Sequence, residues 1–270
     1  MADTVVVTPK APSWTAQLVK GSARFAVPTV LIVVWQVTVQ SGWINPYLLP
    51  APVNIVLRMG EQLWSGTLIP DTLLTIYRAF SGFLIAAAFG IVIGTLAARN
   101  ALARWFFDPL VSIGFPAPKI AFMPLFALWF GLGDQAKILM VALSCVFPII
   151  SATYLGTGAI DRYLIWSARN LGVSRRRVIW KIVVPAALPQ ILNGLQIAFP
   201  MSLIVTVVTE MITAGGGLGG YMILAARDAL SDQVFVGILT TSIVGYVLLA
   251  AADRLRRYLL RWHTESMSVL

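Results

Sequence analysis

Long apolar runs alternate with short polar connections along this chain of 270 residues. A helix that crosses a hydrocarbon core of about 30 Å needs about 20 apolar residues, because each residue advances the helix by about 1.5 Å. Strands of a β-barrel would instead alternate apolar and polar positions, and runs such as Phe83–Leu96 do not. Six segments therefore predict membrane-spanning helices: Phe25–Ile44, Ala79–Ala98, Pro109–Phe130, Ile138–Gly158, Ile191–Thr213 and Val234–Ala252.

The composition agrees with an all-α integral membrane protein. Apolar residues make up 58% of the chain and charged residues only 11%, whereas soluble domains carry about 25% charged residues. The first apolar segment is too long for a secretory signal, and Thr38–Ser41 lacks a small-x-small cleavage pattern. We therefore expect an uncleaved anchor, and we divide the chain into a tail at 1–24, a membrane domain at 25–258 and a second tail at 259–270.

The positions of the basic residues predict the topology and explain the formal charge of +9. With a cytoplasmic N-terminus, most of the 20 Lys and Arg residues face the cytoplasm, as the positive-inside rule requires. Those near the outer face are Arg58, Arg78, Lys137 and Arg227, and we expect Arg78 to extend towards the outer surface. Both termini are therefore expected to be cytoplasmic. Anionic lipid at the inner face accounts for the basic balance without nucleic acid.

Side chains that carry covalent or metal chemistry are scarce. A single cysteine, Cys145, and a single histidine, His263, leave no set of ligands at metal-binding spacing. The sequence contains neither a phosphate-binding G-x-x-x-x-G-K-[ST] loop nor a G-x-S-x-G nucleophile elbow. The run Gly215–Gly220 is interpreted as a flexible turn between spans, with ligand contact as the alternative. We expect a protein that is not an enzyme and that takes any nucleotide energy from another chain.

Two other classes of membrane protein fit this sequence less well. A secondary transporter driven by an ion gradient would have internal inverted repeats, which the sequence does not display. A membrane enzyme would gather reactive side chains near the interface, but Asp108, Asp134 and Asp161 are scattered. On the outer side, prolines at the start of the loop 45–72 discourage a regular helix, and a short amphipathic helix with Ile55 and Met59 on its apolar side is expected after them.

The longest cytoplasmic connection, at about 159–190, predicts two short helices. Gly172 supplies the end of the first helix, and Ser174 can cap the second. Three arginines at 175–177 then crowd the positive end of that second helix, which costs about 0.3–1 kcal/mol for each charge. We therefore expect these arginines to bind either lipid phosphates or an acidic partner. Pro185 and Pro189 are expected to end the element and to turn the chain back into the membrane.

This connection resembles the cytoplasmic loop of the permease subunits of bacterial ABC importers, whose pattern is E-A-A-x-x-x-G-x(9)-I-x-L-P. Ala168, Gly172 and Pro185 match it, while Trp166 stands where the family has its acid and Ser167 where it has its first alanine. In the family this loop is the coupling helix, which sits in a groove of the ATPase subunit. The resemblance assigns coupling to the following residues: Trp166, Ser167, Ala168, Arg169, Leu171, Gly172, Ile182 and Pro185.

The resemblance covers about residues 30–255 and narrows the branch. Strings such as Leu49–Pro52, Trp129–Gly133 and Phe147–Ile149 are similar to those of importers of alkanesulfonates, taurine and nitrate, a branch that also takes up vitamin precursors and aromatic carboxylates. It implies the type I importer fold in a bacterial inner membrane. The implied partners are two copies of an ATPase that bind ATP and Mg, a solute-binding protein, and a second copy of the permease.

Ionisable groups inside the spans are the candidates for contact with a solute, since a charged residue at the centre of a helix costs about 2.5–3.5 kcal/mol on insertion scales. Lys119 lies between Pro118 and Pro124, where broken helical bonding can open the backbone to a cavity, and its charge suits an anionic solute. The alternatives are that Lys119 pairs with Glu210 or lies near a membrane face. Glu210 itself is either a structural lock or part of the lining.

The fifth apolar segment carries a polar stripe. Asn193, Gln196, Ser202 and Thr206 are the polar side chains, and Ser202 and Thr206 lie four residues apart on one helical face. A water-accessible route would account for such a stripe. Hydrogen bonds between helices would account for it equally well, and these contribute about 0.6 kcal/mol on average in membrane bundles.

Overall fold

The computed structural model describes residues 14–261, and all regular elements among them are helical. The first elements along the chain are α1 (Trp14–Gln40), α2 (Pro52–Trp64), α3 (Leu68–Arg99), α4 (Ala101–Gly114), the 3-10 helix η1 (Lys119–Phe122), α5 (Met123–Phe130) and α6 (Asp134–Gly158). The remaining elements are α7 (Arg162–Asn170), α8 (Arg175–Val178), the π-helix η2 (Ile179–Val183), α9 (Val184–Thr213), α10 (Gly217–Arg227) and α11 (Ser231–Leu259). His263 and most of the two expected tails lie outside the described residues.

Helices occupy all six of the apolar segments. Four are long and apolar enough to cross a membrane as single helices, namely Leu68–Arg99, Asp134–Gly158, Arg176–Thr213 and Ser231–Leu259. The first apolar segment corresponds to α1, whose apolar part Ala26–Gln40 is shorter. This helix begins at Trp14, inside the segment expected to be a tail, and contains Pro28. The expected amphipathic helix is α2, which buries Ile55.

The third apolar segment, Pro109–Phe130, differs from the single span that its hydropathy predicts. It consists of α4 and the η1–α5 unit, which meet at an angle of 95°. Pro116 and Pro118 lie in the connection. A proline provides no N–H donor and disfavours the helical conformation of the residue before it, so helical bonding cannot continue through this connection. The break presents Lys119 at the start of η1.

Three helices, α3, α6 and α9, form a tightly packed core. Small residues on α3 recur every four positions as Gly82, Ala86, Gly90 and Gly94. A Cβ atom added to Gly82 would lie 2.6 Å from the Cβ of Val141 on α6, and one added to Gly90 would lie 2.7 Å from the Cγ2 of Ile149. On another side of α6, a Cβ at Gly194 of α9 would lie 2.5 Å from the Cβ of Ala152. Small residues thus bring the backbones close, as in other membrane helix pairs.

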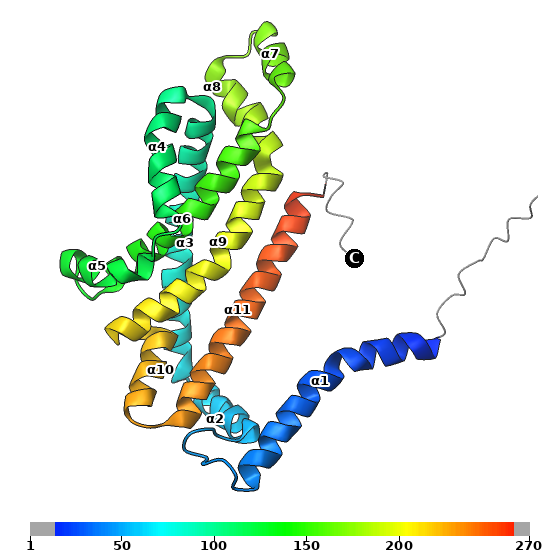
Figure 1. Ribbon diagram of the computed structural model, residues 1–270, viewed down its shortest axis with the longest axis vertical. Coiled ribbons are helices and arrows are strands. Elements are labelled where there is room, and N and C mark those ends of the chain that lie inside the picture. Colours follow the sequence, from blue (N-terminus) through cyan, green and yellow to red (C-terminus); the bar gives the residue numbers. More distant parts are fainter. Residues whose placement is uncertain (1–13, 262–270) are drawn as a thin grey trace, which may run out of the picture.

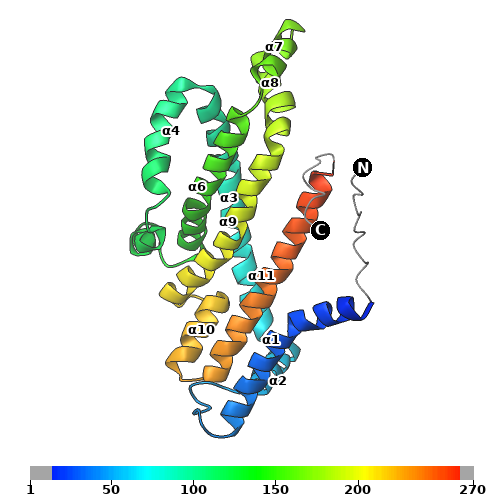
Figure 2. The same cartoon turned by 45° about the vertical axis from the view of Figure 1, so that its right-hand side comes forward.

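The other helices lie beside this core and at both of its ends (Figure 1). Figure 1 shows α7 and α8 at one end of the long axis, with α10 and α2 towards the other end. There, Ile55 of α2, Leu68 of α3, Leu218 of α10 and Val236 of α11 form a buried apolar cluster. Figures 1 and 2 both place α4 beside the core, while α1 extends away from it beyond α11.

The close approach of α3 to α6 generates a prediction. We expect Gly90→Ala to destabilise the permease by about 1–3 kcal/mol, because a Cβ there would overlap Ile149 and force the two helices apart. As a matched control, Gly60→Ala on α2 adds a Cβ that meets nothing within 4 Å and raises helix propensity by about 1 kcal/mol. Thermal unfolding of both purified variants in detergent should show opposite shifts. Equal melting temperatures for the two would contradict the packing described above.

Candidate functional site

The connection between α6 and α9 forms a compact helical knuckle, which we define as α7, α8 and the turn between them. Asp161 caps α7 by accepting a hydrogen bond from the backbone N–H of Tyr163 at 2.8 Å. At its other end Gly172 adopts a positive φ of 78° and donates to the Arg169 carbonyl, while Val173 donates to the Ala168 carbonyl. This pair of bonds is a Schellman motif, which explains why a glycine is needed at this position.

One side of the knuckle is buried and the other side is exposed. Ala168 packs against Val178 and Val183, with Ile182 partly buried beside them. Trp166 is 55% exposed and Leu171 is 81% exposed. The ring of Trp166 lies edge-on to that of Tyr163, with 5.6 Å between their centroids. Of the remaining residues assigned to coupling, Ser167, Arg169, Gly172 and Pro185 are exposed.

A π-helical turn, and not a break, joins the knuckle to the fifth apolar segment. Pro185 is the second residue of α9 and Pro189 lies inside it, so the expectation that these prolines end the element is wrong. The Val184 N–H donates to the carbonyl of Ile179, five residues earlier. Because Pro185 has no N–H and its ring collides with the carbonyl four residues before it, a widened turn lets the helix pass through the proline. The helical path therefore runs continuously from Arg176 to Thr213.

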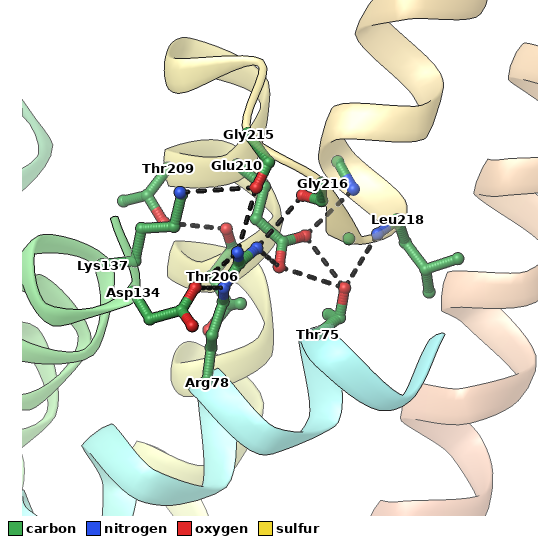
Figure 3. A network of polar contacts seen from close by, with 12 residues as sticks. Thr75, Arg78, Asp134, Lys137, Thr206, Thr209, Glu210, Gly215, Gly216 and Leu218 are labelled. Carbon is green, nitrogen blue, oxygen red and sulfur yellow. Dashed lines mark hydrogen bonds and ion pairs between the residues drawn. The ribbon is translucent and has the colours of Figure 1, made fainter. Parts of the chain in front are cut away.

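At the other end of the core, a buried ionic network joins four helices (Figure 3). Arg78 of α3 is 3% exposed and donates from Nη1 to Glu210 Oε1 of α9 at 2.8 Å. Its Nε and Nη2 both donate to Asp134 Oδ1 of α6, at 2.8 and 2.6 Å. Arg78 also donates to the carbonyls of Gly215 and Gly216. The guanidinium thus holds two carboxylates and the turn before α10 in fixed positions.

Glu210 and a third carboxylate, Asp71 of α3, cap the N-terminus of α10. Glu210 Oε2 accepts from the Gly219 N–H at 3.0 Å, and Asp71 Oδ1 accepts from the Gly217 N–H at 2.8 Å. Thr75 accepts from the Leu218 N–H and donates to Glu210. Negative charge at this end of a helix is stabilised by the helix dipole. The glycine turn is therefore fastened by the chain's own side chains, and these three backbone donors are not free for an external anion.

Glycine is required in this turn for two reasons. Gly216 and Gly217 have positive φ angles of 67° and 80°, and a Cβ on Gly217 would lie 2.2 Å from Glu210 Oε1. A Cβ on Gly219 would lie 2.2 Å from the carbonyl oxygen of Val207. The glycine-rich sequence is thus explained by a close approach of α10 to α9.

This network corrects two expectations from the sequence. Arg78 does not extend to the outer surface, and Glu210 pairs with it and not with Lys119. Lys137 is 1% exposed and donates to the carbonyl of Leu132 at 2.9 Å. Sequence reasoning missed Thr75 and Asp134 as partners. Their one available signal was the position of Glu210 inside an apolar segment and of Arg78 and Lys137 directly before two others, where ionisable groups must find partners.

The other residues proposed to line a pathway fall into separate places. Ser202 and Thr206 are fully buried, and their hydroxyls donate to the carbonyls of Phe199 and Ser202 on their own helix. Gln196 donates to Asp253 of α11 at 2.6 Å. Asn193 accepts from Arg256 of α11 at 2.6 Å. Contacts between helices therefore account for Asn193 and Gln196, and helix backbone accounts for the two hydroxyls.

Lys119 stands apart from all of these residues. Its Nζ donates to the carbonyl of Phe115 at 2.6 Å and lies 5.0 Å from the centre of the Phe147 ring on α6. It is partly buried at the break between α4 and η1. The described residues contain no group of three or more His, Cys, Asp and Glu side chains that could hold a metal.

Comparison with known proteins supplies the context for this geometry. A family model described as the binding-protein-dependent transport system inner membrane component matches residues 90–263. The chain is 37% identical over 240 residues to a putative aliphatic sulfonates transport permease of Bacillus subtilis, covering 88% of this chain and 87% of that protein. It is 31% identical to the taurine transport system permease of Escherichia coli, covering 87% and 88% of the two chains. A formylaminopyrimidine transport permease of Halalkalibacterium halodurans is also 31% identical, with 87% and 94% covered.

Solved structures share the fold. The inward-facing methionine ABC transporter MetNI matches with a TM-score of 0.63 at 20% identity, covering 74% of this chain and 98% of that one. An amino acid ABC transporter crystallised with histidines matches with a TM-score of 0.59 at 16% identity, covering 75% and 96%. The expected type I importer permease fold is confirmed.

The buried network generates a second prediction. Arg78→Leu should destabilise the permease by about 3–5 kcal/mol, because it leaves Glu210 buried without its charged partner. The double variant Arg78→Leu with Glu210→Leu should lose less stability than the sum of the two single variants. Arg58→Leu, which removes the exposed pair with Glu61, should cost less than about 1 kcal/mol. Thermal unfolding measures all four, and a strictly additive double variant would show that the pair is not coupled.

Proposed function

The chain belongs to the family of binding-protein-dependent transport system inner membrane components, and from that membership we propose that two copies of it enclose the route of an organic anion across the bacterial inner membrane. The family makes it a multi-pass permease subunit of an ABC importer, which is not an enzyme. Its partners by family are an ATPase and a solute-binding protein. Two ATPase copies bind the ATP and Mg in our proposal.

The exposed knuckle is the observation that carries the coupling assignment. Three of its large apolar side chains, Tyr163, Trp166 and Leu171, are each more than half exposed at one end of the molecule. Arg162 and Arg169 are exposed among them, and Asp161, the acid nearest to α7, is engaged in its cap. A partner groove with an apolar floor and acidic walls fits this surface. The knuckle, and with it both termini, faces the cytoplasm in this proposal, as the positive-inside rule requires.

The packing of the core supports a route between two copies. Added Cβ atoms at Gly82, Gly90 and Gly194 would overlap neighbouring helices, so the space between α3, α6 and α9 cannot admit a solute. By contrast, α4 has no buried residue and leaves a long apolar side uncovered. The route therefore lies outside the three-helix core, on the side of α4 and α5, where a second copy completes the enclosure. A homodimer is the simplest arrangement that does so.

The solute in our proposal is a small organic anion of the sulfonate class. Relatives named for aliphatic sulfonates and for taurine both transport sulfonates by name, while the formylaminopyrimidine relative shows that identity near 31% does not fix the solute. The position of Lys119 favours the anion. Its ammonium group lies at the helix break beside an apolar cavity, where a cation attracts an anion more strongly than it does in water.

Among the pathway candidates, Lys119 is the residue for which we propose contact with the solute. The other five, Glu210, Asn193, Gln196, Ser202 and Thr206, have polar partners within the protomer, which supports a structural role for them. In the transport cycle, the binding protein delivers the solute to the outer face and closure of the ATPase pair moves the knuckle. The continuous helix from Arg176 to Thr213 carries that movement to the outer end of the core.

The docking assignment gives the third prediction. A Trp166→Ala and Leu171→Ala double variant should retain its melting temperature, since both side chains are more than half exposed, but should recover at least tenfold less ATPase in co-purification. Trp64→Ala is the matched control, because Trp64 is 96% exposed on α2 at the far end of the molecule. Recovery of ATPase at the wild-type level with the double variant would contradict the coupling role.

The anion assignment gives the fourth prediction. Lys119→Gln should lower the initial rate of sulfonate uptake by about tenfold or more, because it removes the cation that offsets the desolvation of the anion. Assembly with the ATPase should remain normal, since Lys119 makes one hydrogen bond, to Phe115, within the described chain. Lys119→Arg should restore part of the rate. Undiminished uptake by Lys119→Gln would reject contact with the anion.

A further inference from the structure

The break in the third apolar segment borders a cavity of about 540 Å³ between α4 and α6. Ile93 of α3, Leu110 of α4 and Phe147 of α6 are among the side chains that line it. Every lining side chain is apolar except that of Lys119. This volume lies in the range of about 300–1,000 Å³ that is usual for small-molecule sites, and a largely apolar wall with one polar group is typical of them.

The methylene groups of Lys119 line this cavity, and its ammonium group is held beside the apolar wall. Its Nζ is fixed by the bond to the Phe115 carbonyl and by the faces of two rings, 5.0 Å from Phe147 and 5.7 Å from Phe115. An ammonium group has three donors, so two remain for the oxygens of an anion. A ligand that satisfies both the cation and the wall must carry a negative head and an apolar tail.

We propose that this cavity, which we name the tail pocket, holds the alkyl chain of the imported anion while Lys119 binds its head. A methylene group takes roughly the volume of a water molecule, about 30 Å³, so a chain of about eight carbons fills less than half of the tail pocket. Each methylene that enters contributes up to about fourfold in affinity. The tail pocket thereby favours longer unbranched chains. This inference rests on the proposed transport of sulfonates.

A neighbouring cavity provides an internal comparison. It measures about 450 Å³ between α3, α5 and α6, and it shares Ile93, Leu143 and Val146 with the tail pocket. Ala142 and Trp129 line it, and no charged side chain does. A pocket without a cation cannot fix an anionic head at its mouth, which is why we assign the alkyl chain to the tail pocket.

Two substitutions of equal size distinguish the cavities. Ala117→Leu adds three carbons to the wall of the tail pocket, and Ala142→Leu adds three carbons to the wall of its neighbour. Leu110→Ala enlarges the tail pocket, and because α4 buries no residue this variant keeps the packed core intact. It gives a second, opposite readout should Ala117→Leu assemble poorly.

The experiment measures initial uptake of ethane-, butane-, hexane- and octanesulfonate by the complete importer in cells that lack other sulfonate uptake. The same binding protein serves every variant, so its own chain-length preference cancels in the ratio of octanesulfonate to ethanesulfonate uptake. We expect Ala117→Leu to lower this ratio at least tenfold, because its added carbons lie two residues from Lys119, beside the point where the chain enters the tail pocket. Leu110→Ala should raise the ratio, and Ala142→Leu should leave it unchanged. Lys119→Gln should slow all four sulfonates alike, because the head is common to them.

The outcomes separate this inference from the function on which it rests. If the wild-type importer takes up none of the four sulfonates, the proposed solute class is wrong, and the proposed role of the tail pocket is wrong as well. If the wild type imports them but Ala117→Leu leaves the ratio unchanged, the function stands and the inference is overturned. If a membrane lipid always occupies the cavity, the alkyl chain of the anion never enters it. Ala117→Leu then leaves the uptake ratio unchanged, which is the second result. A lowered ratio in Ala142→Leu also overturns it.

Discussion

The bond between Arg78 and Glu210 is the interaction on which the α10 end of this permease depends. Neither side chain can reach bulk water, since Arg78 is 3% and Glu210 0% exposed. Each must therefore find its partner inside the protein, and between them they fix α3, α9 and the start of α10 relative to one another. Asp134 adds the start of α6 to the same guanidinium. A pair of charges that costs free energy to bury is retained here because it defines how four helices meet.

Glycines allow the helices that this ion pair joins to approach one another closely. Along α3 they let α6 approach until an added Cβ would overlap Val141 or Ile149, and at α10 they admit the Glu210 carboxylate beside the backbone of Gly217. Dispersion contacts between close backbones replace the hydrophobic effect, which does not drive helices together inside lipid. The core is consequently closed to solutes, and α4, which buries no residue, lies on the side where we propose that transport and dimer formation occur.

Local signals in the sequence predicted much of this structure, and distant contacts explain what they missed. Helix length and hydropathy located the apolar helices, and Asp161 and Gly172 delimit α7 through bonds to residues no more than four positions away. The partner of Glu210 lies 132 residues earlier, so no local pattern could name it. The prolines around Lys119 predicted broken helical bonding there, but the 95° bend was missed because the hydropathy of the whole segment is that of a single span. The π-turn at Pro185 was missed because the usual effect of proline is to end a helix.

The continuity of the helix from Arg176 to Thr213 gives the two ends of the molecule a mechanical relation. Its 38 residues extend over about 57 Å at about 1.5 Å per residue. A hydrogen-bonded helix resists compression along its axis, so displacement of the knuckle must either move Glu210 at the far end or be absorbed in the π-turn, where the regular bonding is already altered. Because Glu210 is bonded to α3 and α10, an axial movement carries the whole network with it and does not break single bonds one by one. The buried pair therefore makes the α10 end of the molecule respond as one body to a force applied at the knuckle.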